Sequence, residues 1–264
     1  LEFRRVLFRS PRAVGGACKV SDMRTNYREH LDAFSRDLIE MCQNVRTLMD
    51  NATVALLTQS LDHAEDALSF SDGLDVIRQR CETRGMQLLA LESPVASDLR
   101  QVVSSIYIVE DFERMGALAT HIARLARLRH PHPVLPEPMV VLVEELARLA
   151  HELGSQTEDL LYAPDADAAV GLRNADDEVD TMTSYILNVV TNRHWEHSTR
   201  EAVDLALLCR YFERYSDHCV NVAARTVFLV TGMKPEAYLE HRRSGDSFDM
   251  DERFAVIEQR FDRT

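Results

Sequence analysis

The chain has few residues that interrupt helices, and it lacks the patterns of several common protein classes. Only 9 glycines and 8 prolines occur among its 264 residues, and no stretch alternates convincingly between apolar and polar residues as a strand would. No apolar run reaches the length of about 18 residues that a membrane-spanning helix needs. A signal peptide with a small-residue cleavage site is not recognisable. These absences predict long helices and a cytoplasmic protein.

Cysteine usage and charge exclude further classes. The five cysteines are odd in number and widely spread, and none forms the C-x-x-C pair of a zinc site or a dithiol redox centre. The chain has 30 Lys and Arg against 43 Asp and Glu, which gives a net charge of −13. Such a charge disfavours binding to nucleic acid or to anionic lipid. We therefore expect reduced core cysteines and no nucleic-acid partner.

The usual catalytic motifs are also missing from the sequence. It contains no Gly-rich phosphate loop, no G-x-S-x-G, no H-E-x-x-H and no E-x-x-H motif of the kind that di-iron helical bundles use in pairs. A metal-dependent phosphohydrolase built on acidic residues stays open as an alternative, although it lacks a recognisable cation for the phosphate. The sequence therefore predicts a protein that is not an enzyme.

Apolar residues recur at spacings of three and four in six segments, which predicts six amphipathic helices. The segments are Tyr27 to about Leu57, His63 to Leu91, Pro94 to about Arg129, Val140 to about Tyr162, one that includes residues 176–190, and one that follows Ser198. Ser198 and Glu201 have the spacing of a capping box, and Gly232 is placed to end the sixth helix. Four prolines between residues 131 and 138 separate the third helix from the fourth.

A shift of 100 residues lays the segment ERMGA, which begins at Glu113, over ERYSD, which begins at Glu213. This internal duplication predicts an all-α fold of two tandem three-helix bundles. The first repeat would cover residues 23–130, the Pro-rich connector residues 131–138 and the second repeat residues 139–234. Residues 1–22 resemble translated cloning sequence and are expected to be a non-native leader. Residues 235–264 are expected to form a charged C-terminal tail.

Two pairs of acidic residues stand out in the second half of the chain. Glu213 and Asp217 are four residues apart, which places both carboxylates on one face of a helix as a two-armed metal ligand. Asp176 and Asp180 repeat this spacing on the preceding helix. Carboxylate sites without Cys or His suit hard cations, or iron and manganese held by oxygen. An arginine three residues before each acid of the sixth helix supports a second interpretation, in which the acids form ordinary ion pairs.

Several motifs in order resemble the PhoU family, namely PVASDLR at residues 94–100, ERMG from Glu113, RYFERYSDH at residues 210–218 and LVTG at residues 229–232. The resemblance spans about Met23 to Lys234. It implies an accessory regulator that restrains bacterial phosphate uptake and keeps the phosphate-starvation response off. The implied partners are the ATPase of the phosphate ABC transporter and a membrane sensor histidine kinase. It also implies a homodimer that meets the membrane only through these partners.

In that family the equivalent acidic motifs bind clusters of metal ions, which would be iron, manganese, zinc or magnesium. The resemblance carries this role to six residues, Asp176, Asp180, Glu213 and Asp217 in the second repeat and Asp75 and Glu113 in the first. Ser71 and Ala117 stand where the first repeat would need further acids. We therefore predict one competent metal site and one that is weak or absent. A metal-free helical adaptor remains the alternative interpretation.

Overall fold

The computed structural model describes residues 16–91, 96–191 and 194–244. Within these ranges the chain forms seven helices and no strand. The helices are α1 (Gly16–Thr58), α2 (Leu61–Leu91), α3 (Ala96–Arg129), α4 (Glu137–Tyr162), α5 (Ala166–Thr191), α6 (Thr199–Thr231) and α7 (Pro235–Ser244). In the same ranges no helix is both long and apolar enough to cross a lipid bilayer. The all-α prediction is confirmed.

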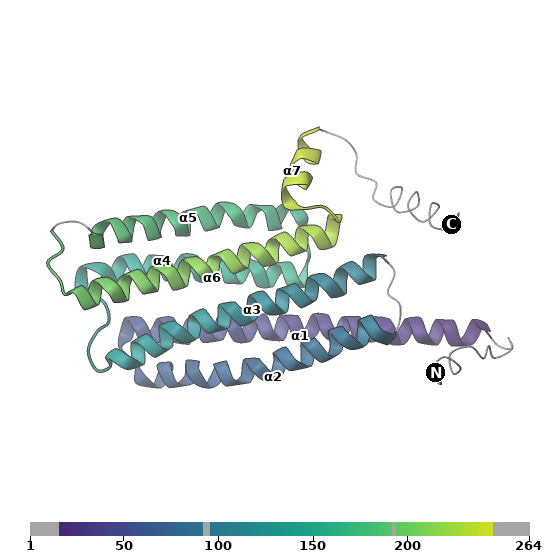
Figure 1. The fold of residues 1–264 in the computed structure, drawn as a ribbon, viewed down its shortest axis with the longest axis horizontal. Helices are drawn as coiled ribbons and strands as arrows, with labels where there is room; N and C mark the ends of the chain where they lie inside the picture. The colour runs from purple at the N-terminus through teal and green to yellow at the C-terminus, as the bar shows by residue number, and fades with distance from the viewer. Residues whose placement is uncertain (1–15, 92–95, 192–193, 245–264) are drawn as a thin grey trace, which may run out of the picture.

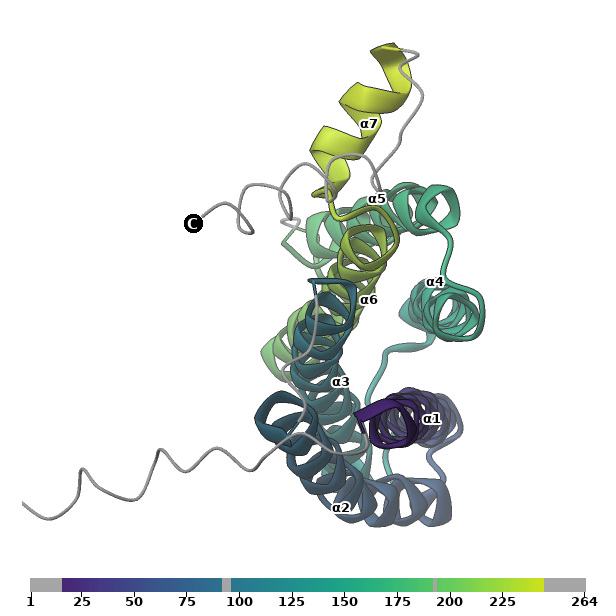
Figure 2. The ribbon, with the colours of Figure 1, turned by 90° about the vertical axis from the view of Figure 1, so that its right-hand side faces the viewer.

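The six long helices form two bundles of three. Helices α1, α2 and α3 contact one another in the first repeat, and α4, α5 and α6 do so in the second. All six run roughly along the long axis of the molecule (Figure 1). The view along that axis shows the two bundles side by side, with α3 next to α6 and α1 facing α4 (Figure 2). The predicted pair of tandem three-helix bundles is therefore present.

The apolar stripes read from the sequence are the faces that the helices bury. Phe34, Met41, Val45 and Leu48 of α1 are each no more than 1% exposed, and their spacing places them on one side of the helix. Burying an aliphatic or aromatic side chain of this size stabilises a fold by roughly 1.5–3 kcal/mol. The buried residues of both repeats belong to one continuous core. The duplication has therefore produced one body with two similar halves.

Helix α1 begins earlier than the periodicity predicted. It starts at Gly16, eleven residues before Tyr27. No proline or further glycine follows Gly16 in this stretch, so nothing in the backbone interrupts a helix that the core stabilises from Tyr27 onward. Residues 1–15 of the expected leader lie outside the described part of the chain. The non-native origin of residues 1–22 stays a prediction.

Both predicted end signals of the sixth helix are confirmed. The side-chain oxygen of Ser198 accepts a hydrogen bond from the Glu201 backbone N–H at 3.2 Å, and a Glu201 carboxylate oxygen accepts one from the Ser198 N–H at 2.8 Å. This capping box satisfies two amide groups at the start of α6. Gly232 ends the helix with φ 70°, a left-handed conformation that glycine adopts without strain.

The first ten residues of the expected tail form the short helix α7. Tyr238 donates a hydrogen bond to Asp167 of α5 at 2.8 Å, and Arg242 contacts the same carboxylate oxygen at 2.7 Å. These contacts tie α7 to the start of α5, where it projects beyond the second repeat (Figure 1). Residues 245–264 of the tail lie outside the described ranges.

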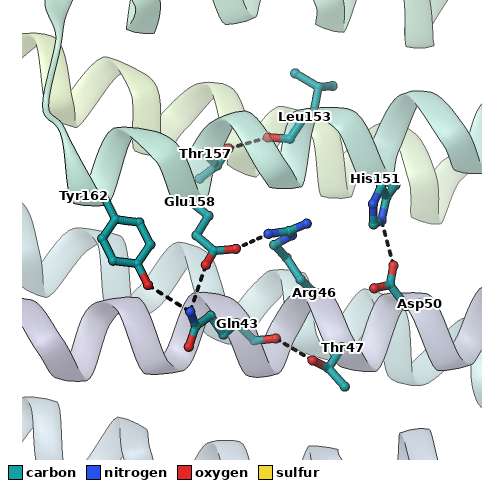
Figure 3. A network of polar contacts seen from close by, with 9 residues as sticks. All are labelled: Gln43, Arg46, Thr47, Asp50, His151, Leu153, Thr157, Glu158 and Tyr162. Carbon is teal, nitrogen blue, oxygen red and sulfur yellow. Dashed lines mark hydrogen bonds and ion pairs between the residues drawn. The ribbon is translucent and has the colours of Figure 1, made fainter.

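The contact between α1 and α4 is a row of polar pairs (Figure 3). Arg46 of α1 pairs with Glu158 of α4, and the Gln43 side-chain amide donates a hydrogen bond to the other Glu158 oxygen at 2.9 Å. Further along the two helices, His151 Nδ1 lies 2.7 Å from Asp50 Oδ1. The Arg46–Glu158 pair is mostly buried and so favours this register of the two helices, because either charge would otherwise lose its partner, whereas the exposed pairs contribute less.

The contact between α3 and α6 also carries charged pairs from both repeats. The Arg129 guanidinium donates two hydrogen bonds to the Asp204 carboxylate, at 2.7 and 2.9 Å. His218 Nδ1 lies 2.8 Å from Asp111 Oδ1. All four side chains are at least three-quarters buried. These pairs hold α6, the helix that carries Glu213 and Asp217, in a fixed position on the first repeat.

Candidate functional site

The second repeat brings three of its four expected acids into one electrostatic group. Asp176 and Asp180 lie on α5, and Asp217 lies on α6, which packs along α5. Burial raises the pKa of Asp176 to about 6, and the neighbouring carboxylates of Asp180 and Asp217 raise it further. We call Asp176, Asp180 and Asp217 the second-repeat acid cluster. The cluster joins acids from two adjacent helices.

Asp176 has an oxygen atom without a partner. Its Oδ1 atom is buried and accepts no hydrogen bond. A buried acceptor left in this state costs roughly 1–3 kcal/mol, and a carboxylate costs more. The protein therefore keeps an unsatisfied anionic oxygen beside two further carboxylates. A bound cation would satisfy this oxygen and relieve the repulsion between the three acids.

Glu213 and Asp217 are also engaged with arginines of their own helix. Arg210 donates to Glu213 at 2.6 Å, and Arg214 donates to Asp217 at 2.9 Å. This is the ion-pair arrangement that the sequence left open as an alternative. All four side chains are partly exposed, so each pair stabilises the fold by less than about 1 kcal/mol. A multivalent cation can therefore displace either arginine from its carboxylate at a small cost in free energy.

The chemistry of the second-repeat acid cluster fits a hard cation. Its donors are oxygen atoms only, and one of them is buried and unsatisfied. Among the residues that the structure describes, no three His, Cys, Asp or Glu side chains converge closely enough to hold a metal ion in their present positions. The fit therefore rests on the donor types and on the orphaned oxygen of Asp176. Asp176, Asp180 and Asp217 are the residues that would hold the ion.

The first repeat has an arginine among its expected acids. Arg78 Nη1 lies 2.5 Å from Glu82 Oε1, and its Nε lies 3.6 Å from Asp75. Desolvation lowers the pKa of Arg78, but the carboxylates of Glu82, Glu113 and Asp75 outweigh it and raise that pKa. The guanidinium therefore supplies the positive charge that a metal ion would supply. Asp75 and Glu113 are close enough to act on one group, but that group is Arg78.

The two positions without acids in the first repeat are also satisfied internally. Ser71 accepts a hydrogen bond from the Thr120 hydroxyl at 3.1 Å, which links α2 to α3. Ala117 is exposed and offers no donor atom. The first-repeat residues do not fit a metal ion, because they hold a fixed cation and no unsatisfied oxygen at these positions. The role of Arg78 was missed in the sequence, although its i−3 and i+4 spacing to Asp75 and Glu82 was a usable signal.

The fold and the acids define a class of protein, an all-helical tandem duplication with a carboxylate cluster on its second repeat. The family model of the PhoU domain matches residues 38–126 and again residues 143–226, once in each bundle. The chain belongs to the PhoU family.

Individual relatives agree with this assignment. A phosphate-specific transport system accessory protein PhoU homolog 2 of Mycobacterium tuberculosis is 41% identical over 81% of this chain and 100% of its own length. A PhoU homolog 1 of Mycobacterium leprae is 41% identical over 81% of this chain and 96% of its own length. Because each match covers 81% of this chain, the likeness extends over both repeats.

Solved structures share the fold. The crystal structure of PhoU from Pseudomonas aeruginosa covers 78% of this chain and 100% of its own length, with a TM-score of 0.72 at 23% identity. The phosphate transport system regulatory protein PhoU from Streptococcus pneumoniae covers 79% of this chain and 98% of its own, with a TM-score of 0.70 at 21% identity. The two-bundle architecture is therefore that of known PhoU structures.

Proposed function

We propose that this chain is an accessory regulator of phosphate transport, which restrains uptake and keeps the phosphate-starvation response off when phosphate is plentiful. The observation that carries the proposal is 41% identity, over 81% of the chain, to relatives described as phosphate-specific transport system accessory proteins. The chain would act by binding other proteins and not by catalysis. Its proposed partners are the cytoplasmic ATPase of a phosphate ABC transporter and a membrane sensor histidine kinase, and it would work as a homodimer.

The proposal includes a metal ion at the second-repeat acid cluster. Asp176, Asp180 and Asp217 would hold it, and Glu213 would join them once released from Arg210. The bound ion supplies positive charge that offsets the repulsion between the carboxylates. The chain's own contribution is to hold α5 and α6 together, so that acids from both helices meet on one surface. A surface formed in this way depends on the ion and can be recognised by a partner only when the ion is bound.

The test is to express the chain in a bacterium that lacks its own PhoU and grows in ample phosphate. We expect the chain to lower the initial rate of phosphate uptake and the output of a starvation-responsive reporter. The variant Asp176→Asn/Asp217→Asn should accumulate to the same level, remain folded and fail in both assays. If the wild-type chain accumulates as a folded protein and changes neither readout, the proposed role is wrong.

The metal-free adaptor remains a second candidate, because Arg210 and Arg214 already neutralise Glu213 and Asp217 in the structure. The two candidates give opposite results for the same variant. An adaptor whose acids serve only in ion pairs would keep its regulatory effect in Asp176→Asn/Asp217→Asn. A metal-dependent regulator would lose it.

A further inference from the structure

Both repeats have a surface groove in the same place. One lies between α1 and α2 with a volume of about 500 Å³, and the other lies between α4 and α5 with a volume of about 680 Å³. The first residues of α2 and α5, Leu61 and Ala166, are 105 residues apart. The same offset relates six lining positions of the α1–α2 groove to six of the α4–α5 groove. The grooves are therefore equivalent features of the duplicated fold.

An arginine bridges the α1–α2 groove. Arg80 of α2 contacts two acids of α1, Glu40 and the buried Asp37, the latter at 2.9 Å. Arg84, one turn further along α2, reaches the other oxygen of Asp37 at 2.8 Å. The acids of this groove are thus neutralised from within the chain. Glu40 and Arg80, the charged residues that line this groove, therefore already have partners.

The equivalent bridge is missing from the α4–α5 groove. The counterparts of Asp37 and Arg80 are Leu142 and Tyr185, which cannot form an ion pair. Leu142 and Met182 are half-buried in the groove, and Tyr185 is 56% exposed at its edge. Helices α4 and α5 also contact each other less extensively than α1 and α2 do. The second repeat therefore leaves an apolar groove open to solvent.

Carboxylates line the side of this groove that α5 provides. Asp177 and Glu178 are exposed lining residues, and within the described ranges neither side chain forms an ion pair. Glu178 lies on nearly the opposite side of α5 from Asp176, whereas Asp177 lies between the groove and the acid cluster, close enough to repel the Asp176 carboxylate. On the α4 side, Glu145 is already paired with Arg148. The unneutralised charge of the groove is therefore negative, in a chain that carries −13 overall.

The shape of the groove suits a helix. Its walls are two neighbouring helices, with lining positions from Leu142 to Leu149 on α4 and from Asp177 to Tyr185 on α5. The first and last lining positions are seven residues apart on α4 and eight apart on α5, or about 10 and 12 Å at 1.5 Å per residue. A third helix packs into such a space by inserting side chains spaced three and four apart between the two ridges.

We propose that the α4–α5 groove is a docking site for a basic amphipathic helix of a partner protein. The apolar face of that helix would cover Leu142 and Met182, and its Lys or Arg residues would meet Asp177 and Glu178. The α1–α2 groove does not bind such a helix, because Arg80 already occupies its acids. This inference rests on the proposed role as a protein-binding regulator, but its test measures the groove alone and leaves the uptake assay independent.

The experiment uses the full chain and a labelled synthetic peptide of about 18 residues, or five turns at 3.6 residues per turn. The peptide has Leu on one face and Lys and Arg on the other, and its binding is followed by fluorescence anisotropy at low and high salt. We expect saturable binding that weakens as salt increases. A peptide of the same composition in scrambled order, and one with Glu in place of Lys and Arg, should bind at least tenfold more weakly.

Two variants locate the site. Leu142→Asp/Tyr185→Arg recreates in the second repeat the bridge seen in the first, and it should weaken peptide binding at least tenfold. Thr181→Lys places a cation at an exposed lining position without touching the core, and it should do the same. The matched control is Val76→Lys, at the equivalent exposed position of the α1–α2 groove, which should leave binding unchanged.

The following results would overturn the proposal. Equal binding of the basic and the Glu-substituted peptide would remove the charge argument. Equal weakening by Val76→Lys and Thr181→Lys would show that the peptide does not distinguish the grooves. If Thr181→Lys left peptide binding intact and changed the mass of the particle in light scattering, the groove would be covered by a second copy of this chain instead.

Discussion

The two repeats share a backbone plan but differ in how they neutralise their acids. In the first repeat, Arg78 stands among Asp75, Glu82 and Glu113, and Arg80 bridges Glu40 and Asp37. In the second repeat, the acid cluster keeps a buried oxygen without a partner, and Asp177 and Glu178 beside the α4–α5 groove are not paired with an arginine in the described part of the chain. An arginine of the same chain neutralises nearby carboxylates, which then need no cation from outside the chain. Carboxylates that no arginine neutralises, such as those of Asp177 and Glu178, remain available to a cationic partner.

The two repeats also solve one packing problem in opposite ways. In the second repeat, Tyr215 is fully buried against Gly154 of α4, where an added Cβ would lie 2.9 Å from the tyrosine hydroxyl. At the equivalent positions the first repeat has two methionines, Met115 and Met49, which are both buried. The second repeat thus has a large aromatic side chain opposite a glycine, where the first repeat has two methionine side chains of intermediate size. The densely packed interiors of the two repeats are therefore filled by different combinations of side chains.

The largest effect is expected from changing this packing. Met49→Ala should lower the free energy of unfolding by about 3 kcal/mol, because it leaves a cavity in the first repeat. Gly154→Ala should lower it by about 1 kcal/mol, because the added methyl group clashes with Tyr215 and a gain in helix propensity offsets part of the strain. Urea denaturation measures both. As a control, Gly171→Ala has no atom within 4 Å of the new methyl group and should stabilise the chain.

A smaller loss is expected when the bridge of the α1–α2 groove is broken. Asp37→Ala leaves Arg80 and Arg84 without their common partner, and we expect a loss of about 2 kcal/mol. Both guanidiniums reach solvent, which keeps the loss below that of a fully buried pair. Leu142→Ala at the equivalent position of the second repeat should cost about 1 kcal/mol, because that side chain is only half-buried. Equal losses in urea denaturation would contradict the difference between the grooves.

The acid cluster predicts a dependence of stability on pH. The pKa of Asp176 is raised to about 6 in the folded chain, so between about pH 4 and pH 6 the folded state binds protons more readily than the unfolded state does. The free energy of unfolding of the metal-free protein should therefore fall as the pH rises through this window. Asp176→Asn should remove that fall and stabilise the metal-free chain at pH 7 by up to about 1 kcal/mol, after discounting for solvent screening.

The first repeat provides the control for this titration. Asp75→Asn removes a carboxylate of the first repeat and leaves the surroundings of Asp176 intact, so the fall in stability that Asp176 causes should persist. Thermal unfolding in a chelator across this range measures both variants. The interpretation of the cluster is wrong if Asp75→Asn abolishes the slope and Asp176→Asn retains it.

The smallest effect on stability is expected for Arg214→Ala. The pair of Arg214 with Asp217 is partly exposed, so its loss should change the free energy of unfolding by less than about 0.5 kcal/mol. The same substitution should strengthen metal binding, because the Asp217 carboxylate that it releases becomes available to a cation. Titration calorimetry with Mn²⁺ should show tighter binding than in the wild type. Weaker binding would mean that Arg214 supports the site.

Much of this arrangement was predictable from local patterns in the sequence. The spacing of apolar residues predicted the six long helices, and the Ser198 to Glu201 motif predicted how the sixth begins. The i, i+4 spacing indicated which acids share a helix face, and the packing of α5 along α6 brings Asp176 close to Asp217. Periodicity did not predict the start of α1 at Gly16, since the first turns of that helix precede its apolar stripe.

The choice of ion-pair partners was harder to predict. Arg80 reaches Asp37 across 43 positions of sequence, and Arg46 reaches Glu158 across 112. Such pairs depend on how each helix is rotated about its own axis and on side-chain rotamers, which periodicity does not determine. The difference between the two grooves follows from these pairs, and so only the structure showed it.

The central claim is that the second repeat, and not the first, holds the metal. The direct test is metal content by mass spectrometry, on protein purified without chelators or an affinity tag, for three chains side by side. The wild type and Asp75→Asn/Glu113→Gln should retain iron, manganese or another oxygen-preferring ion, and Asp176→Asn/Asp217→Asn should lose it while staying folded. Retention by the second-repeat variant together with loss from the first-repeat variant would contradict the account, as would three folded proteins without metal.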